Sequence, residues 1–204
     1  RHLLEIHISR KKPLLFIGSA GTGKTALITE YLQHLKDENL YQSITNFTSK
    51  TSSESLQQNI FESGIVKLSN TLFGLGSGKC MIYFIDDINM PYVDKYGTQS
   101  PIALMRQIID YGIVYDRANL EEYRRIQDLY FCGCMNPKAG SFTIEIRLQR
   151  HFSVFAFPIP NEITIKQIYN TILEHHFSGF RNETIKNMSS KIVNASYSLF
   201  NRIL

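Results

Sequence analysis

The sequence predicts an α/β fold in which a parallel five-stranded sheet is flanked by helices. Apolar, β-prone runs alternate along the chain with stretches of helical periodicity, and four of these runs are almost continuously apolar. Strands that are apolar on both faces are typical of parallel sheets covered by helices on both sides. A glycine-rich segment also joins the first run to the first helical stretch. The expected strands are residues 13–18, 41–48, 81–86, 129–135 and 154–158.

Residues 18–25 carry the pattern Gly-x-x-x-x-Gly-Lys-Thr between the first apolar run and a helical stretch. In this context the pattern predicts a phosphate-binding loop rather than a glycine-rich turn with an incidental lysine. Glycines let the backbone fold around an anion, which meets backbone N–H groups and a helix N-terminus. We expect Lys24 to reach the outer phosphates and the Thr25 hydroxyl to contact Mg²⁺. The residues assigned to the loop are Gly18, Ser19, Ala20, Gly21, Thr22, Gly23, Lys24 and Thr25.

Helical patterns fill most of the remaining chain and continue beyond the last strand. A second glycine-rich segment, residues 74–79, precedes a strand and lacks the spacing of a phosphate loop, so we interpret it as a flexible loop. The prolines and Asn161 in residues 158–161 indicate a boundary between two domains. The expected helices are residues 24–35, 53–68, 101–111, 162–177 and 183–204.

We therefore expect residues 1–160 to form a large α/β nucleotide-binding domain, and residues 161–204 to form the start of a small helical domain. Two helices bury little surface without further partners, so the second domain is expected to be incomplete. The chain begins with Arg1 rather than Met, and we expect it to be a piece of a longer protein.

Composition argues against several classes of partner. Lys and Arg number 22 against 18 for Asp and Glu, and long basic blocks are absent, so we expect no nucleic-acid binding. No apolar run approaches the ~20 residues that span a bilayer, and the start lacks the apolar stretch of a signal peptide, so we expect no membrane association. The three cysteines favour a reduced, intracellular protein, and we expect Cys132 and Cys134 to pack in the core.

Two carboxylates, Asp86 and Asp87, end the third expected strand. Behind a phosphate loop, this arrangement predicts that Asp86 holds Mg²⁺ through its water shell and that Asp87 polarises an attacking water. Without that loop, a capped strand end would be an equally good interpretation. The Asp87 side chain is one methylene shorter than that of Glu. Because a general base set back by ~1 Å from the water loses on the order of 10²-fold in rate, Asp87 predicts slow hydrolysis.

Asn136 follows the fourth expected strand and precedes Pro137. A polar side chain at this strand tip could orient a water near a γ-phosphate, although Asn-Pro is also an ordinary turn starter. Arg147 and Arg150 follow, three residues apart, and share a face if the segment is helical. In a ring-forming ATPase, an arginine at this place would project into the neighbouring module and stabilise transition-state charge. A surface ion pair is the alternative, and the sequence does not distinguish the two arginines.

These motifs occur in the order found in AAA+ ATPases, P-loop NTPases in which a helical lid follows the α/β domain. The sequence between them resembles dynein heavy chain, and most resembles the third AAA+ module of the axonemal branch. The resemblance covers about residues 13–160. The segments that carry it are residues 84–91 (FIDDINMP), 94–107, 115–117 (YDR), 134–144 and 147–152 (RLQRHF).

The resemblance implies a module of an intramolecular ring that walks on microtubules, in which the first module is the main hydrolytic site and the third gates it. Lys24, Thr25, Asp86 and Asn136 match nucleotide-site positions of the family, whereas Asp87 stands where Glu is usual. Arg147 or Arg150 would reach the site of the preceding module. Residues 49–78 would form an insert within the second helix, and residues 115–127 a hairpin. The sensor arginine of the lid would lie further along the chain.

The implied cofactors are ATP or ADP with Mg²⁺, and the implied partners are neighbouring AAA+ modules and other dynein chains. Microtubules would be contacted only by the full-length motor, in the cytoplasm and cytoskeleton and in the axoneme of a cilium or flagellum. The parent protein would be an ATP-hydrolysing enzyme, whereas hydrolysis by this module is left open. The alternatives are a free-standing AAA+ ATPase or remodeller, and a structural ring segment without nucleotide turnover.

Overall fold

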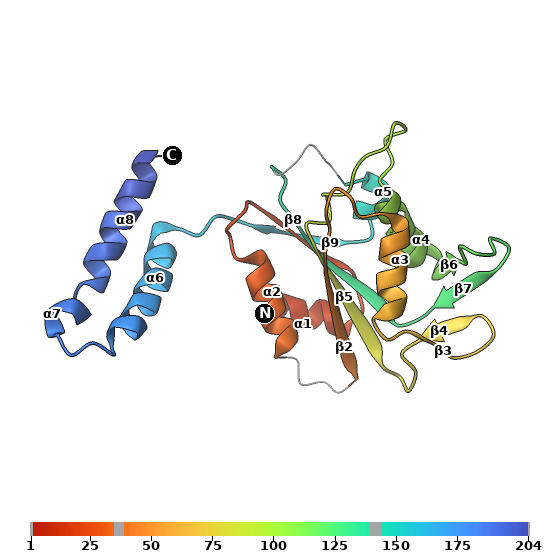
Figure 1. Cartoon of the computed structure of the whole chain (residues 1–204), viewed down its shortest axis with the longest axis horizontal. Coiled ribbons are helices and arrows are strands. Elements are labelled where there is room, and N and C mark those ends of the chain that lie inside the picture. The colour runs from red at the N-terminus through yellow and green to blue at the C-terminus, as the bar shows by residue number, and fades with distance from the viewer. Residues whose placement is uncertain (1, 35–38, 139–143, 204) are drawn as a thin grey trace. The chain divides into compact units, whose positions relative to one another are not determined.

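The computed structural model describes residues 2–34, 39–138 and 144–203 (Figure 1). The chain divides into two compact units, residues 1–158 and residues 159–204, each of which is described by itself. No helix within the described residues is long and apolar enough to cross a membrane.

The first unit contains nine strands and five helices among its described residues. Its strands are β1 (Leu14–Gly18), β2 (Leu40–Asn46), β3 (Val66–Lys67), β4 (Leu72–Gly74), β5 (Cys80–Asp86), β6 (Ile113–Tyr115), β7 (Tyr123–Ile126), β8 (Leu129–Met135) and β9 (Ser153–Phe157). Its helices are α1 (His2–Ser9), α2 (Lys24–Gln33), α3 (Ser53–Glu62), α4 (Ser100–Tyr111) and α5 (Ile146–Gln149).

A five-stranded sheet of order β2-β5-β8-β1-β9 forms the centre of the first unit. All four of its strand pairs are parallel, which confirms the predicted fold class. Ile17 of β1 pairs with Met135 of β8, and Ile85 of β5 pairs with Gly133 of β8. The carboxyl ends of β1, β8 and β5 therefore lie at one edge of the sheet, with β8 in the middle.

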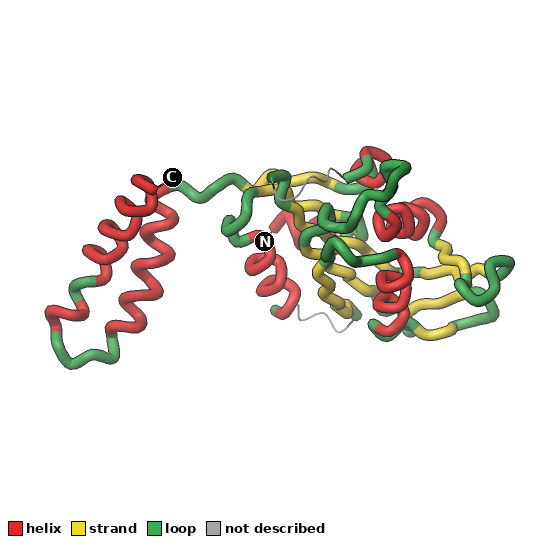
Figure 2. Tube along the Cα trace, turned by 45° about the horizontal axis from the view of Figure 1, so that its top comes forward, coloured by secondary structure: helices red, strands yellow, loops and turns green. Residues whose placement is uncertain are grey.

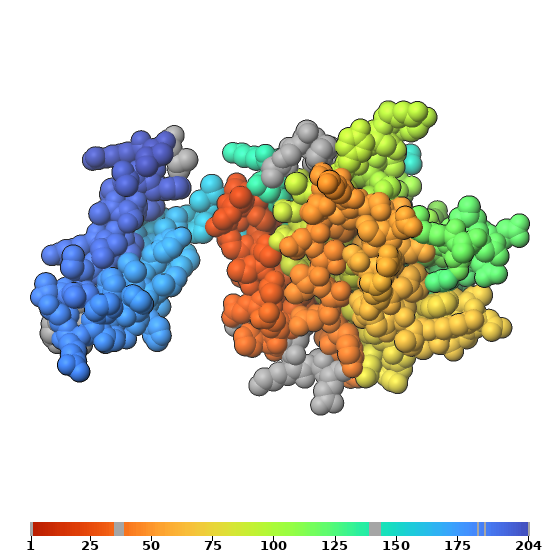
Figure 3. Space-filling view, viewed as in Figure 1, coloured from red at the N-terminus to blue at the C-terminus, as the bar shows by residue number. Residues whose placement is uncertain are grey.

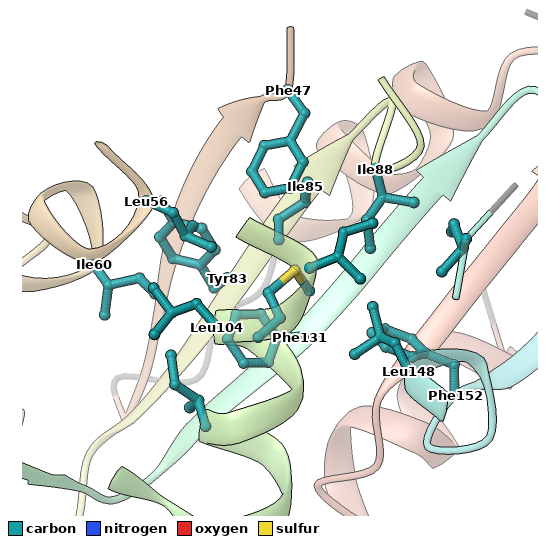
Figure 4. Close-up of a cluster of buried hydrophobic side chains, with 14 of the residues drawn as sticks. Phe47, Leu56, Ile60, Tyr83, Ile85, Ile88, Leu104, Phe131, Leu148 and Phe152 are labelled. Atoms are coloured by element: carbon teal, nitrogen blue, oxygen red, sulfur yellow. The ribbon is translucent and has the colours of Figure 1, made fainter. Parts of the chain in front are cut away.

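Helices cover both faces of this sheet, as Figure 2 shows by the yellow strands lying between red helices. On one face, Leu56 of α3, Leu104 of α4 and Leu148 of α5 pack over the sheet (Figure 4). Tyr83 and Phe131 come from adjacent strands and make an edge-to-face contact with their ring centroids 6.0 Å apart. Helix α5, which contains Arg147, therefore covers part of this face.

The opposite face packs against α1 and α2. Leu4 of α1 and Ile28 of α2 join Phe16, Phe84 and Cys132 in a second buried cluster. Successive residues of β1, β5 and β8 thus contribute to opposite faces, as strand geometry requires. All three cysteines are buried free thiols, and Cys132 and Cys134 pack in the core as predicted.

A small second sheet of order β3-β4-β7-β6 lies beside the central one. In Figure 3 its β3–β4 part (yellow-orange) and its β6–β7 part (green) lie side by side. Strands β6 and β7 pair antiparallel, which confirms the hairpin expected between residues 115 and 127. The helix predicted over residues 53–68 was wrong beyond Glu62: Gly64 has a φ of 107°, and Val66–Lys67 pair antiparallel with β4. Gly74, expected in a flexible loop, ends β4.

The second unit consists of α6 (Glu162–Phe177), α7 (Glu183–Lys186) and α8 (Ser189–Ile203). Asn161 caps α6, because its side chain accepts a hydrogen bond from the Thr164 N–H at 2.9 Å. Helix α6 packs against α8, with Lys166 over the Tyr197 ring. The single helix predicted over residues 183–204 was wrong, because a turn at residues 187–188 separates α7 from α8. Asn187 is a weak helix former whose side chain competes for backbone hydrogen bonds.

Gly18 stands where β1 and β9 approach too closely for a side chain. A Cβ at this position would lie 2.4 Å from the Phe157 carbonyl oxygen and 2.9 Å from the Phe157 Cβ. We expect Gly18→Ala to lower the free energy of unfolding by about 2 kcal/mol or more, because the backbone of β1 or β9 must move to make room for the methyl group. Chemical denaturation measures this change. Gly133→Ala is the matched control in the same sheet, since its Cβ would meet side-chain ends at 3.3–3.4 Å. An equal loss in both variants would contradict this explanation.

Candidate functional site

The loop after β1 forms an open cradle. Gly21 and Gly23 have φ values of 74° and 85°, in the left-handed region that favours glycine. A Cβ built on either residue would meet no atom within 4 Å, so the space over the loop is open. Thr22 stabilises the loop from within, because its hydroxyl donates to the Ser19 carbonyl at 2.9 Å. The loop thus leaves open space beside its two left-handed glycines.

Lys24 lies over this loop with 8% of its surface exposed. Its Nζ donates to the carbonyl oxygens of Gly18 at 2.8 Å and Ser19 at 2.7 Å. These bonds hold a buried ammonium group at the mouth of the cradle. A buried charge is costly unless it is hydrogen-bonded, and here backbone carbonyls supply the partners.

Helix α2 begins at the same place. Gly23 is its N-cap and provides no side-chain cap, and the first turn contains no acidic residue. The N–H groups of the first turn and the positive end of the helix dipole therefore face the cradle without a competing carboxylate. Such a helix start is an anion-binding site.

Thr25 joins the loop to the end of β5. Its hydroxyl donates to Oδ2 of Asp86 at 2.7 Å, although β8 lies between β1 and β5 in the sheet. Two hard oxygen ligands are thus held together beside the cradle, which is what Mg²⁺ requires when phosphates and waters complete its shell. The described residues contain no cluster of three or more His, Cys, Asp or Glu side chains that could hold a metal by itself.

Asp87 follows in a left-handed conformation, with a φ of 53°. Its N–H donates to Oδ1 of Asp86 at 3.1 Å. Burial and the neighbouring Asp86 carboxylate raise the pKa of the Asp87 carboxyl, and the Lys24 ammonium opposes this rise. Asp87 is thereby placed beside both Asp86 and the lysine of the loop. A carboxylate whose pKa is raised is a better proton acceptor than an ordinary surface aspartate.

The pKa of the Cys134 thiol, near the tip of β8, responds to charged groups of the loop and of the end of β5. Burial raises its pKa, and Asp86 and Asp87 raise it further, whereas Lys24 lowers it. Burial alone raises the pKa of the neighbouring Cys132 to about 12. The loop after β1 and the end of β5 therefore meet over the strand that separates them.

Asn136 follows β8, at the same edge of the sheet. Its Oδ1 accepts a hydrogen bond from the Lys138 N–H at 3.0 Å, which leaves the amide nitrogen as the donating end of the side chain. Its backbone oxygen accepts a hydrogen bond from the Asn89 side chain at 3.1 Å. The sequence analysis did not single out Asn89. Its position two residues after the Asp86-Asp87 pair is the feature that could have identified it.

The two arginines lie elsewhere, around the short helix α5. Arg147 is within α5 and Arg150 caps its C-terminus. Arg150 donates to Oδ1 of Asp110 at 3.2 Å, and the His151 Nε2 lies 2.9 Å from the same oxygen. Arg147 is 74% exposed, and its Nε lies 3.8 Å from Glu145. The ion pair between Arg150 and Asp110 is the alternative expected for these arginines, although the 40 residues between the two hide Asp110 as the partner.

Both arginines line a groove of about 730 Å³ between α3, α4, α5 and the β6–β7 hairpin. Arg106 and Arg117 line it as well, so the groove is predominantly basic. None of residues 18–25 is among the described residues that line it. The structure thus brings together the loop, Asp86, Asp87 and Asn136, and places the arginines at a separate face.

Comparison with known proteins identifies one matching family. The profile of the family described as "P-loop containing dynein motor region" matches residues 1–160. Dynein axonemal heavy chain 17 of Homo sapiens is 40% identical over 205 residues, which cover 100% of this chain and 4% of that protein.

Relatives from distant organisms match over the same length. Dynein beta chain, flagellar outer arm, of Chlamydomonas reinhardtii is 37% identical over 203 residues, covering 100% of this chain and 4% of its own. Dynein axonemal heavy chain 10 of Homo sapiens is 37% identical over 203 residues, covering 99% of this chain and 4% of its own. The chain thus spans about 4% of the length of these relatives.

The raised pKa of the Asp87 carboxyl predicts a pH-dependent cost to stability in metal-free buffer. Above the pKa of this group in the folded protein, the ionised carboxylate is less favourable folded than unfolded; below the unfolded value, the cost is absent. We expect Asp87→Asn to raise the free energy of unfolding modestly at pH 7, with no gain near pH 3. Asn tolerates the left-handed backbone, so the substitution tests charge.

Denaturant titrations between pH 3 and pH 8 measure this difference. Glu121→Gln, at an exposed position of the hairpin loop, controls for the loss of one negative charge. A gain for Asp87→Asn that is independent of pH would contradict the assignment.

Proposed function

Because this chain belongs to the family of P-loop containing dynein motor regions, we propose that it binds ATP and ADP with Mg²⁺ as the third AAA+ module of an axonemal dynein heavy chain. The observation that carries the proposal is the hydrogen bond between Thr25 and Asp86. It joins the loop after β1 to the end of β5, which supports a site in which both contribute to binding a Mg-nucleotide. Segments 84–91 and 94–107 support the assignment to the third module.

In this proposal residues 18–25 surround the phosphates. Backbone N–H groups of the loop and of the first turn of α2 donate to phosphate oxygens. Lys24 exchanges its bonds to the Gly18 and Ser19 carbonyls for bonds to the outer phosphates. Thr25 and Asp86 would hold Mg²⁺, and the ion would supply charge neutralisation at the phosphates.

Hydrolysis at this site would use Asp87 and Asn136. Asp87 accepts a proton from the attacking water, and the Asn136 amide orients that water beside the γ-phosphate. The side chain of Asp87 is one methylene shorter than that of Glu, which favours slow turnover. A module that binds nucleotide tightly and hydrolyses it slowly is suited to switching a neighbouring motor site.

Arg147 and Arg150 would act on the nucleotide of the preceding module in the ring. Arg150 must leave Asp110 to do so, whereas Arg147 already projects from the surface. Residues 161–204 would be the start of the helical lid over the base. Neighbouring modules, other dynein chains and, through the full-length motor, microtubules would be the partners, in the axoneme of a cilium or flagellum.

Two alternative functions make different predictions. A free-standing AAA+ ATPase or remodeller would assemble into a hydrolysing homohexamer. A structural ring segment would bind no nucleotide, yet it would have no physical need for the buried Lys24 on an open cradle.

Removal of the lysine tests nucleotide binding directly. We expect Lys24→Ala to weaken the affinity for Mg-ATP and Mg-ADP about 10- to 150-fold, since a hydrogen bond to a charged group contributes roughly 1.5–3 kcal/mol. Isothermal titration calorimetry measures this change. Lys67→Ala removes an exposed lysine of β3 and should leave affinity unchanged. Equal affinity of Lys24→Ala and the parent would refute the assignment.

Lengthening the proposed base tests hydrolysis. We expect Asp87→Glu to raise the single-turnover rate by up to about 10²-fold, because the carboxylate advances by ~1 Å. The left-handed backbone at residue 87 suits Glu less well, so a small loss of stability should accompany the gain. Asp87→Asn should bind nucleotide like the parent and hydrolyse it more slowly. Turnover by Asp87→Asn at the parent rate would show that another group is the base.

A further inference from the structure

Two buried amide side chains lie beside the site and have no role in the mechanism above. Asn89 is 1% exposed and Gln99 is 5% exposed. Burying a primary amide is costly unless its hydrogen bonds are made inside the protein. The contacts of these two side chains therefore indicate what they do.

Asn89 ties the loop after Asp87 to the end of β8. Its Nδ2 donates to the Asn136 backbone oxygen at 3.1 Å. One residue earlier, the Ile88 N–H donates to the Cys134 carbonyl at 3.0 Å. Two consecutive residues after the Asp-Asp pair are thus bonded to the strand tip that carries Asn136.

Gln99 holds the same loop from the other side. Its Nε2 donates to the Pro91 carbonyl at 2.8 Å and, more weakly, to the Asn89 carbonyl at 3.4 Å. Gln99 is also the N-cap of α4, a position where Ser, Thr, Asp or Asn is preferred because a short side chain can cap the helix. Its side chain makes no such cap and binds the loop instead.

We propose that Asn89 and Gln99 are positioning residues for Asn136. Gln99 fixes the backbone at Asn89, and Asn89 fixes the backbone at Asn136. Because the Lys138 N–H occupies Oδ1 of Asn136, the amide nitrogen is the end of the side chain that would donate to a γ-phosphate. This inference rests on the proposed nucleotide site and deepens it.

Discrimination between a triphosphate and a diphosphate tests this role without requiring hydrolysis. The quantity measured is the ratio of the affinities of a non-hydrolysable Mg-ATP analogue and of Mg-ADP, by calorimetry on the whole chain. We expect Asn136→Ala to lower this ratio about tenfold, the effect of one lost hydrogen bond to a charged group. Asn89→Leu should lower it in the same direction, with Mg-ADP affinity within about twofold of the parent. The double variant should lose no more than the larger single effect, because both changes remove one interaction.

Gln57→Met is the matched control. Gln57 is a buried amide at 8% exposure that donates to the Tyr115 carbonyl at 3.0 Å, away from the phosphate loop. It should lower the melting temperature without changing the affinity ratio. If Asn89→Leu does not fold, Gln99→Met removes the other donor at nearly constant volume and should shift the ratio in the same direction.

The possible results separate this inference from the proposed function. A parent protein that binds no nucleotide overturns both. A ratio that falls in Asn136→Ala but not in Asn89→Leu or Gln99→Met overturns the positioning role alone. Equal losses of Mg-ADP and analogue affinity in Asn89→Leu, or additive effects in the double variant, would mean that Asn89 stabilises the fold and does not position Asn136.

Discussion

The position of β8 between β1 and β5 is the constraint on which the site depends. Parallel pairing aligns the carboxyl ends of the three strands, so that the loop after β1, the carboxylates after β5 and the amide after β8 share one edge. The Thr25–Asp86 hydrogen bond is possible because the loop crosses over the tip of β8. The register of each strand then decides which side chain faces the loop and which enters the core. A change in strand order would separate these groups even if every residue were kept.

Charge is concentrated at this edge at some cost to the free protein. An ammonium group and two carboxylates lie around the buried thiol of Cys134, whose pKa responds to all three. Burial and the neighbouring Asp86 carboxylate both oppose ionisation of the Asp87 carboxyl and raise its pKa. Proteins commonly accept such costs where charge is needed for chemistry. Backbone carbonyls of Gly18 and Ser19 accept hydrogen bonds from the Lys24 ammonium and so stabilise its buried charge.

Sequence patterns among neighbouring residues predicted much of this fold. The features they missed depend on contacts between residues that are far apart in the chain. The glycine-rich motif and the continuous apolar strands predicted the sheet, because each depends on neighbouring residues. The helix predicted over residues 53–68 ends at Glu62, because Val66 pairs with β4 instead. A local helical pattern does not show that a strand elsewhere in the chain is available for pairing. Asp87 and Asn136 were identified from their place at strand ends. The contacts of Asn89, Gln99 and Asp110 depend on packing between elements, and local sequence carries little trace of it.

Helix α4 has bonds to functional groups at both of its ends. At its start Gln99 binds the loop beside the nucleotide site, and toward its end Asp110 binds Arg150. Arg106, between them, binds Glu145 at 2.9 Å, just ahead of α5. A helix of 12 residues is about 18 Å long and resists bending. One rigid element therefore carries the contact to the loop after β5 at its start and the contact to Arg150 near its end, so the spacing between these two contacts follows from the length of α4.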